Sequence, residues 1–264
     1  MSTLFPFHGG LKTVRHKSES NRQAILAGPL PLRLTVPLRQ HIGATAKPLV
    51  QAGDRVLKGQ MIGQADGYIS AAVHAPTSGV VTAVESRPVP HPSGLPDVCV
   101  AIETDGEECW IERQAVDYRR LHSSEVRGVL RNAGVVGLGG AGFPSAVKLN
   151  PGGHGKPLDT LILNGAECEP WITCDDRLMR ERAAGIVAGL HVMVHLLEPR
   201  EVLIGIEDDK PDAAAAMTAA CAGTGYQVRV VPTRYPSGSV KQLIKLLTGK
   251  ETPVDGLPVD VGVQ

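Results

Sequence analysis

Leu158-Asp159-Thr160-Leu161-Ile162-Leu163, followed directly by Asn164-Gly165-Ala166-Glu167-Cys168-Glu169-Pro170, is the stretch that decides the fold. A largely apolar run of this length, closed by turn-forming and polar residues, is typical of a strand buried on both faces of a parallel sheet. The same succession of strand and helix continues downstream. It predicts helices over residues 177–197, 211–222 and 240–247, and further strands over residues 202–206 and 228–231.

Helix boundaries are marked by their usual residues. Pro211 can open the second helix, and Gly249 can end the third. Strands that alternate with helices build a parallel sheet covered on both faces through right-handed crossovers. Such sheets bind ligands outside the carboxyl ends of their strands. Loops of polar and turn-forming residues follow the predicted strands, over residues 164–170, 207–210 and 232–238. We therefore expect these three loops to line one crevice.

A glycine-rich loop precedes this region. It reads Gly137-Leu138-Gly139-Gly140-Ala141-Gly142-Phe143-Pro144 and contains Gly-x-Gly-x-x-Gly. Only Val135 and Val136 precede it, too few for the first strand of an ordinary dinucleotide-binding fingerprint. Because glycine has no side chain, the loop lets a flat ring or a pyrophosphate approach its main-chain N–H groups. Pro144 can then open a short helix that carries Lys148 toward a phosphate. The alternative is a glycine-rich surface turn.

The first part of the chain predicts a small β domain. Residues 32–105 alternate short apolar stretches with Gly and Pro, and the phrases around Gly53-Asp54 and His74-Ala75-Pro76-Thr77-Ser78-Gly79 suggest paired hairpins of a folded-over barrel. These segments resemble the biotinyl and lipoyl carrier fold. Lys58 lies inside the turn phrase rather than at a hairpin tip, so a structural barrel is favoured over a carrier. Beyond it, Ser123 is predicted to cap a helix that runs to Arg131 and is closed by Gly134.

Composition excludes several classes of function. The 264 residues suffice for two domains, and Lys plus Arg and Asp plus Glu both number 27, which leaves no basic field for a nucleic acid. Aromatic residues make up 3%, too few for base-stacking platforms. The five cysteines form no Cys-x-x-Cys pair, so neither a disulfide framework nor a metal-ligand group is indicated. We expect a soluble chain that docks on a membrane partner.

Three lesser candidates each have a simpler explanation. His191 and His195 have the spacing of zinc ligands but lack a catalytic glutamate and a third ligand, so ordinary histidines are favoured. Cys168 invites a redox role, although a small residue filling a tight turn explains it. Residues 207–209 form an acidic run that a cation could use, but a solvated loop is the default.

Taken in order, the motifs resemble those of a known family. The glycine loop followed by Asn-Gly-x-Glu-x-Glu-Pro looks like the flavin and NADH site of the flavoprotein subunit of respiratory complex I. The chain is more similar still to the RnfC family of the Rnf electron transport complex. Three further motifs carry this resemblance: Phe7-His8-Gly9-Gly10, the barrel turn at His74 and Tyr235-Pro236-Ser237-Gly238.

The resemblance implies FMN as hydride acceptor with NADH over it, and no side chain acting as a catalytic nucleophile. Carried over residue by residue, it implies contacts with the flavin, the nucleotide and their phosphates. The implied positions are Gly137, Gly139, Gly140, Gly142, Phe143, Lys148, Asn164, Glu167 and Glu169. Residues Ser237, Gly238, Ser239 and Lys241 add a helix start whose free N–H groups favour anions.

The chain also departs from the complex I pattern. Ala166 replaces an acidic residue, and Ser239-Val240-Lys241 lacks the paired glutamates, which puts nucleotide contacts from that segment in doubt. Proteins of the RnfC family continue into a segment that completes the flavin site and into a domain with [4Fe-4S] clusters. The present chain, expected to be truncated, ends at Gln264 before these cysteines, so the clusters are expected only in the missing part.

The resulting expectation is an α/β protein: a barrel-sandwich hybrid domain followed by a Rossmann-like parallel-sheet FMN/NADH-binding domain. The implied organisation is an N-terminal extension over 1–31, the barrel over 32–105, the α/β domain over 123–250 and the start of a C-terminal segment over 251–264. The implied function is NADH oxidation and electron transfer to iron-sulfur centres. The implied partners are the other subunits of an ion-translocating complex, at the cytoplasmic face of the bacterial inner membrane. A carrier and a docking subunit with a relic site remain the alternatives.

Overall fold

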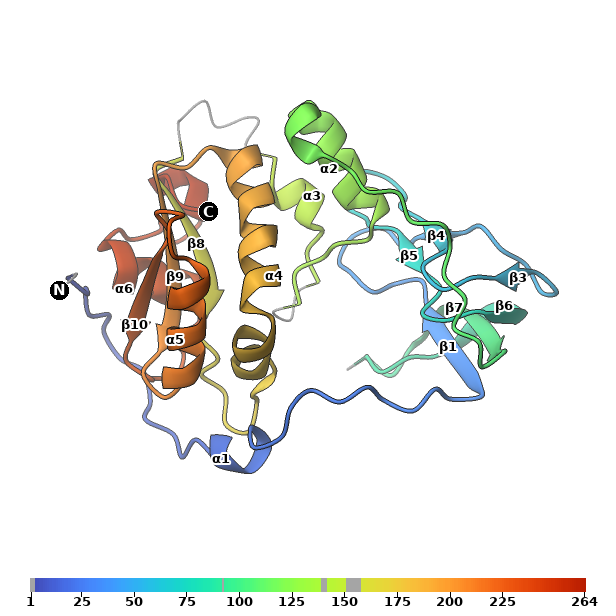
Figure 1. Cartoon of the computed structure of the whole chain (residues 1–264), viewed down its shortest axis with the longest axis horizontal. Helices are drawn as coiled ribbons and strands as arrows, with labels where there is room; N and C mark the ends of the chain where they lie inside the picture. Colours follow the sequence, from blue (N-terminus) through green and yellow to red (C-terminus); the bar gives the residue numbers. More distant parts are fainter. Residues whose placement is uncertain (1–2, 92, 139–141, 151–157) are drawn as a thin grey trace. The chain divides into compact units, whose positions relative to one another are not determined.

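The computed structural model describes residues 3–91, 93–138, 142–150 and 158–264 (Figure 1). The chain divides into two compact units: Met1–Ala27 together with Pro151–Gln264, and Gly28–Asn150. We call the first the α/β unit and the second the barrel unit. The division places the N-terminal residues with the α/β unit, and the segment from residue 123 to residue 150 with the barrel unit.

The α/β unit contains the parallel sheet that the sequence predicts. Its strands lie in the order β10-β9-β8, and both neighbouring pairs are parallel. Helices α4 and α5 lie on one side of this sheet and α6 on the other (Figure 1). The strands are β8 (Thr160–Gly165), β9 (Glu201–Glu207) and β10 (Gln227–Val231), and the helices are α4 (Cys174–Leu197), α5 (Pro211–Ala220) and α6 (Val240–Thr248). The unit also contains two short helical elements. The helix α1 (Lys17–Ser20) lies in its N-terminal segment, and the 3-10 turn η2 (Pro258–Val261) lies just before the C-terminus.

Alternation along β9 explains how the sheet is covered. Leu203 packs with Val231 and with Leu243, Leu246 and Leu247 of α6. Ile204 and Ile206 are fully buried and, by the period of two, face the opposite side. Gly205 faces α6 because a Cβ there would meet Leu243 at 3.0 Å. A strand buried on both faces is what its continuous apolar sequence predicts.

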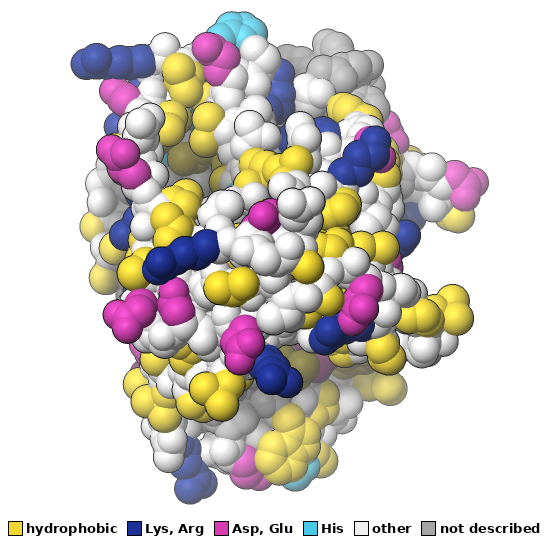
Figure 2. Space-filling view, turned by 90° about the vertical axis from the view of Figure 1, so that its right-hand side faces the viewer, with side chains coloured by type: hydrophobic (Ala, Val, Ile, Leu, Met, Phe, Trp, Pro, Cys, Tyr) yellow, Lys and Arg dark blue, Asp and Glu magenta, His cyan; other side chains and the backbone are white. Residues whose placement is uncertain are grey.

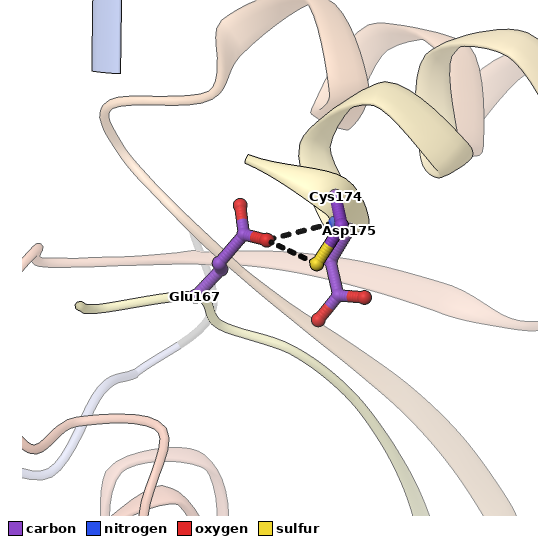
Figure 3. Close-up of side chains that lie close together, drawn as sticks. All are labelled: Glu167, Cys174 and Asp175. Atoms are coloured by element: carbon purple, nitrogen blue, oxygen red, sulfur yellow. Dashed lines mark hydrogen bonds between the residues drawn. The ribbon is translucent and has the colours of Figure 1, made fainter. Parts of the chain in front are cut away.

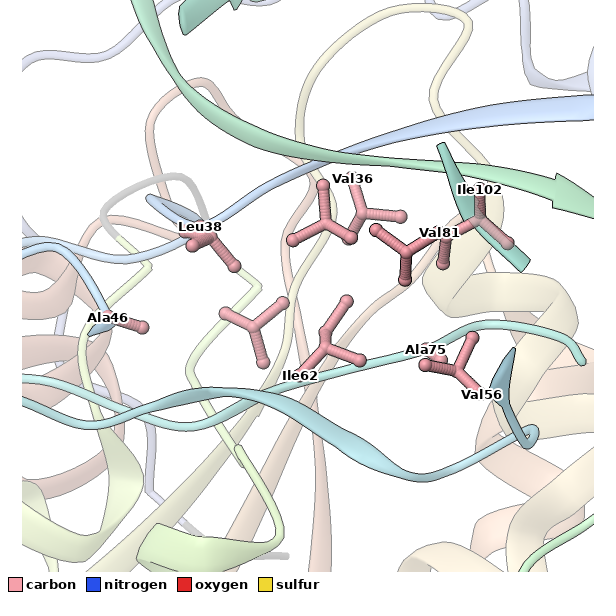
Figure 4. Packing of buried hydrophobic residues seen from close by; sticks show 10 residues of the cluster. Val36, Leu38, Ala46, Val56, Ile62, Ala75, Val81 and Ile102 are labelled. Carbon is pink, nitrogen blue, oxygen red and sulfur yellow. The ribbon is translucent and has the colours of Figure 1, made fainter. Parts of the chain in front are cut away.

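The barrel unit is built from two small antiparallel sheets. One has the strand order β1-β7-β6-β3 and the other β2-β4-β5. The strands are β1 (Arg33–Pro37), β2 (Lys47–Pro48), β3 (Arg55–Val56), β4 (Met61–Gln64), β5 (Val73–His74), β6 (Gly79–Pro88) and β7 (Pro96–Thr104). Their shared core includes Val36, Ile62, Val81 and Ile102 (Figure 4).

Two helices complete the barrel unit, after the 3-10 turn η1 (Tyr118–Arg120): α2 (Ser123–Asn132) and α3 (Ser145–Lys148). The predicted cap of α2 at Ser123 is wrong by one residue. His122 is the N-cap: its Nδ1 accepts from Ser124 N at 3.3 Å, and its N–H donates to Glu125 Oε2 at 2.8 Å. A histidine ring can replace the usual hydroxyl because one of its nitrogens is an acceptor. Gly134 follows the helix with φ +69°.

Charges of both signs are interspersed on the face of the molecule that Figure 2 shows. This agrees with a formal net charge of zero. Among the described residues, no helix combines the length and apolar character needed to cross a membrane.

Candidate functional site

The loops after the three parallel strands meet at one edge of the sheet, as predicted. Asn164, at the end of β8, donates from Nδ2 to the carbonyl of Gly238 at 2.8 Å, and its Oδ1 accepts from Ala166 N at 3.1 Å. A Cβ on Gly238 would lie 2.8 Å from Ala166 O, so the two loops touch backbone to backbone. Asn164 therefore ties the acidic turn, residues 164–170, to the loop that follows β10.

Glu167 is turned into the protein and holds the start of α4. Its Oε1 accepts from Asp175 N at 2.8 Å and from the Cys174 thiol at 3.3 Å (Figure 3). Its Oε2 accepts from Asp176 N at 3.4 Å. A carboxylate suits this place because the first N–H groups of a helix lack partners and carry partial positive charge. The capping explains why α4 begins at Cys174, three residues before the predicted start.

The Glu167, Cys174 and Asp175 ligand atoms lie within 4.8 Å of one another, a grouping that could hold a metal ion. The helix start accounts for it, because the Glu167 oxygens already accept N–H groups and a helix N-terminus disfavours cations. Burial and the hydrogen bond to Glu167 raise the pKa of the Cys174 thiol. Partial burial and the nearby Glu167 carboxylate raise the pKa of Asp175. Cys174 is therefore a thiol at neutral pH, a poor metal ligand.

A second buried network joins the loops after β9 and β10. Glu207 is fully buried; its Oε1 accepts from Ser237 Oγ at 2.5 Å and its Oε2 from Lys210 Nζ at 2.8 Å. Lys210 also donates to Asp209 Oδ1 at 2.7 Å and to the carbonyl of Glu167 at 3.1 Å. Lys210 thus supplies an internal positive charge to Glu207 and Asp209, two of the three carboxylates of the acidic run.

The predicted phosphate-binding residues near α6 differ in availability. The hydroxyl of Ser237 is committed to Glu207, and the Lys241 ammonium donates to the carbonyls of Pro253 and Val254 at 2.9 and 2.8 Å. Ser239 is the N-cap of α6 and makes no side-chain capping bond. The first N–H groups of α6 therefore have no intrahelical acceptor and fit an anionic group.

Glu169 is the predicted acidic residue that stays exposed. Its neighbour Cys168 is buried, and burial raises the pKa of that thiol. Cys168 therefore fills the turn as a thiol, in line with the structural interpretation of this cysteine.

The glycine loop belongs to the barrel unit. Gly137 N donates to Phe143 O at 2.8 Å and Ser145 N to Val135 O at 3.0 Å, which closes the base of the loop around the Val136–Pro144 bridge. No strand precedes it among the described residues 105–138, unlike the strand that leads into an ordinary dinucleotide fingerprint. Gly139, Gly140 and Ala141 lie outside the described residues.

The remaining predicted residues of this segment are placed as follows. Gly142 has φ +57°, and a Cβ there would lie 3.1 Å from Gln40 O, so local backbone packing requires a glycine. Phe143 is half-buried, and Lys148 is exposed at the end of α3, with no ion-pair partner among the described side chains. Lys148 is thus available to an anion.

Lys58 and His191, the residues on which the carrier and zinc-site interpretations depend, each contact another side chain of the protein. The Lys58 ammonium forms a salt bridge with Glu108 and lies 5.2 Å from the ring centroid of Trp110, unlike a carrier lysine at an exposed hairpin tip. His191 Nδ1 lies 2.6 Å from the hydroxyl of Tyr226. Neither histidine of the 191/195 pair belongs to a metal-ligand cluster among the described residues.

Comparison with known proteins places the chain in a family. Residues 130–264 match the family of the Nuo51 FMN-binding domain, and residues 5–107 match the RnfC barrel sandwich hybrid domain. The RnfC subunit of the ion-translocating oxidoreductase complex of Pseudomonas aeruginosa is 50% identical over all 264 residues. The chain belongs to the RnfC family. The recognition and the fold class predicted from the motifs are therefore confirmed.

Other relatives agree. The corresponding protein of the ion-translocating oxidoreductase complex from Vibrio cholerae O1 is 46% identical over 98% of this chain. This RnfC-family chain spans about a third of the length of these curated relatives, with 34% of each covered. Among solved structures, an NAD+-reducing [NiFe]-hydrogenase in the H2-reduced state matches 49% of this chain and 25% of that chain, with a TM-score of 0.41 and 24% identity.

Sequence reasoning missed the N-terminal contribution to the site. Lys17 is buried and donates to the carbonyls of Glu167 and Ile172, each at 2.5 Å, and Arg15 approaches Asp208 and Asp209. No local signal marks these residues, because a lysine and an arginine in a polar segment read as surface residues. Only the folded chain brings Lys17 to the acidic turn and the Arg15 side chain to the loop after β9.

Proposed function

We propose that this chain is the flavin- and NADH-binding part of an electron-transfer subunit of an ion-translocating oxidoreductase complex. The observation that carries the proposal is the polar edge of the β8–β9–β10 sheet, within the segment that matches an FMN-binding domain family. There the exposed Glu169 and the start of α6, whose N-cap side chain makes no capping bond, lie next to the buried Glu207–Lys210 ion pair.

The contacts of each residue indicate whether its side chain holds the loops together or can bind a ligand. Asn164, Glu167, Glu207 and Ser237 use their side chains to hold the loops, which pre-organises the edge before any ligand arrives. Glu169 can accept hydrogen bonds from ribose or amide groups of NADH, and the N–H groups of the first turn of α6 can bind a phosphate. A bound flavin would accept two electrons from NADH and release them singly.

The glycine-rich segment remains a predicted contact region for FMN. Gly137, Gly139, Gly140, Gly142, Phe143 and Lys148 fall inside the matched FMN-binding segment. Exposed Lys148 can pair with the FMN phosphate. Electron transfer to [4Fe-4S] centres, assembly with other subunits and a peripheral place at the cytoplasmic face of the inner membrane complete the proposal for the whole protein.

A direct test is flavin uptake and reduction by the purified chain. We expect added FMN to bind, and its oxidised absorbance band to bleach when NADH is added without oxygen. Loss of a hydrogen bond to a charged group costs about 1.5–3 kcal/mol, so Glu169→Gln should weaken NADH binding roughly ten- to hundredfold. Stopped-flow bleaching against NADH concentration measures this.

Glu251→Gln is the matched control, because Glu251 is an exposed glutamate that pairs with Lys245 away from the carboxyl edge. We expect it to leave NADH binding unchanged. Failure of the chain to take up FMN would refute the flavoprotein function. Unchanged bleaching kinetics in Glu169→Gln would instead favour a site in which this carboxylate has no part, as in a docking subunit with a relic site.

A further inference from the structure

The N-terminal segment crosses the carboxyl edge of the sheet. We call residues 11–17 the strap. Leu11 pairs with Tyr235 in the loop after β10: Leu11 N donates to Tyr235 O at 2.7 Å, and Tyr235 N donates to Leu11 O at 2.9 Å. Arg15 lies at the loop after β9, with guanidinium nitrogens 3.8 Å from Asp208 Oδ1 and from Asp209 Oδ2. The strap thus contacts the loops in the order of the strands in the sheet.

Three consecutive strap residues then attach to the acidic turn and the residues after it. The Arg15 carbonyl accepts from Trp171 N at 3.0 Å, and the His16 ring stacks on Trp171 with centroids 4.6 Å apart and planes 5° from parallel. Lys17 inserts its ammonium below the turn, where it donates to Glu167 O and Ile172 O and lies 3.8 Å from Glu167 Oε2.

Lys17 and Lys210 share one acceptor. Both ammonium groups donate to the main-chain carbonyl of Glu167, Lys17 at 2.5 Å and Lys210 at 3.1 Å. Both lysines are less than a tenth exposed. Burial of two ammonium groups is costly unless each is paired and hydrogen-bonded, so this arrangement exists only when the strap is docked. The position of the Glu167 carbonyl in turn fixes the path of the chain to Glu169, two residues on.

We propose that the strap is a built-in wall of the nucleotide site and that Lys17 is a positioning residue that sets the acidic turn for NADH. This inference rests on the proposed function, because it assigns to Lys17 a role in nucleotide binding at that same edge. Without the Lys17 ammonium, the Glu167 carbonyl keeps one donor, and the turn gains freedom that NADH must then remove on binding.

The test uses the full chain loaded with FMN and reduced by NADH without oxygen in a stopped-flow instrument. We expect Lys17→Met to raise the apparent Kd for NADH about tenfold or more, while the limiting rate of flavin bleaching changes less. Rates are normalised to bound flavin, and urea unfolding records stability separately. Lys17→Arg keeps the positive charge and the hydrogen-bond donors, so it should recover part of the affinity that Lys17→Met loses. Lys47→Met, which alters an exposed lysine of the barrel unit, should leave the Kd unchanged.

Arg15→Gln is a milder second variant, because the Arg15 side chain is about half exposed and its loss leaves Lys17 in place. It keeps the test decisive if Lys17→Met does not fold, with an expected rise in Kd of a few fold. A folded Lys17→Met with wild-type Kd, or an Arg15→Gln with wild-type Kd when Lys17→Met is unfolded, overturns the strap inference alone. A wild-type chain that never bleaches with NADH overturns both this inference and the proposed function.

Discussion

At the scale of single residues, the buried Glu207–Lys210 pair is a place where one substitution should strongly lower the stability of the protein. Lys210→Met leaves Glu207 fully buried without its cationic partner, and removal of one member of a buried pair costs about 3–5 kcal/mol. We expect a loss of stability of this order in urea unfolding. The double variant Lys210→Met with Glu207→Gln should recover part of it, because the glutamine can still accept from Ser237. A double variant no more stable than the single one would contradict this explanation.

The same pair has a defined pH dependence. Burial acts to lower the pKa of Lys210, but hydrogen bonds and charges from Asp209 and Glu207 outweigh it and raise that pKa overall. A lysine whose folded-state pKa is raised contributes its full stability below the unfolded-state pKa, and loses it only as the pH rises through the folded-state value. The difference in unfolding free energy between wild type and the Lys210→Met/Glu207→Gln double variant, which lacks the buried carboxyl as well, should therefore stay constant in urea unfolding from neutral to mildly alkaline pH.

At the scale of elements, the contact between two loops gives a paired prediction. Gly238→Ala places a Cβ 2.8 Å from Ala166 O, so the loops must separate and strain the Asn164 bond; we expect a loss of about 1–3 kcal/mol and weaker NADH binding. Gly189→Ala in α4 meets no atom within 4 Å, so it should stabilise the chain by about 0.5–1 kcal/mol. Thermal unfolding of both variants measures the contrast, and equal effects would contradict the role of the loop contact.

The elements also show what a sequence can and cannot predict. The strands and helices of the α/β unit follow from apolar periodicity, so β9 and α6 lie within a residue of the prediction. The start of α4 was missed because the side chain that accepts its first N–H groups belongs to Glu167, eight residues before Asp175. Lys17 could not be found at all, since a residue's burial through contacts 150 positions away leaves no local pattern. Glu169 could be named as a candidate because the motif that contains it is contiguous in the sequence.

At the scale of the whole molecule, the two units have separate cores, and each contains one of the two tryptophans. Trp110 reports on the barrel unit and Trp171 on the α/β unit. Ile62 is fully buried in the barrel core, so Ile62→Ala should cost that unit about 2–5 kcal/mol. With Trp171→Phe or Trp110→Phe as single-tryptophan backgrounds, we expect the Trp110 urea transition to fall and the Trp171 transition to stay. A common shift of both would mean that the units unfold as one cooperative body and would contradict separate cores.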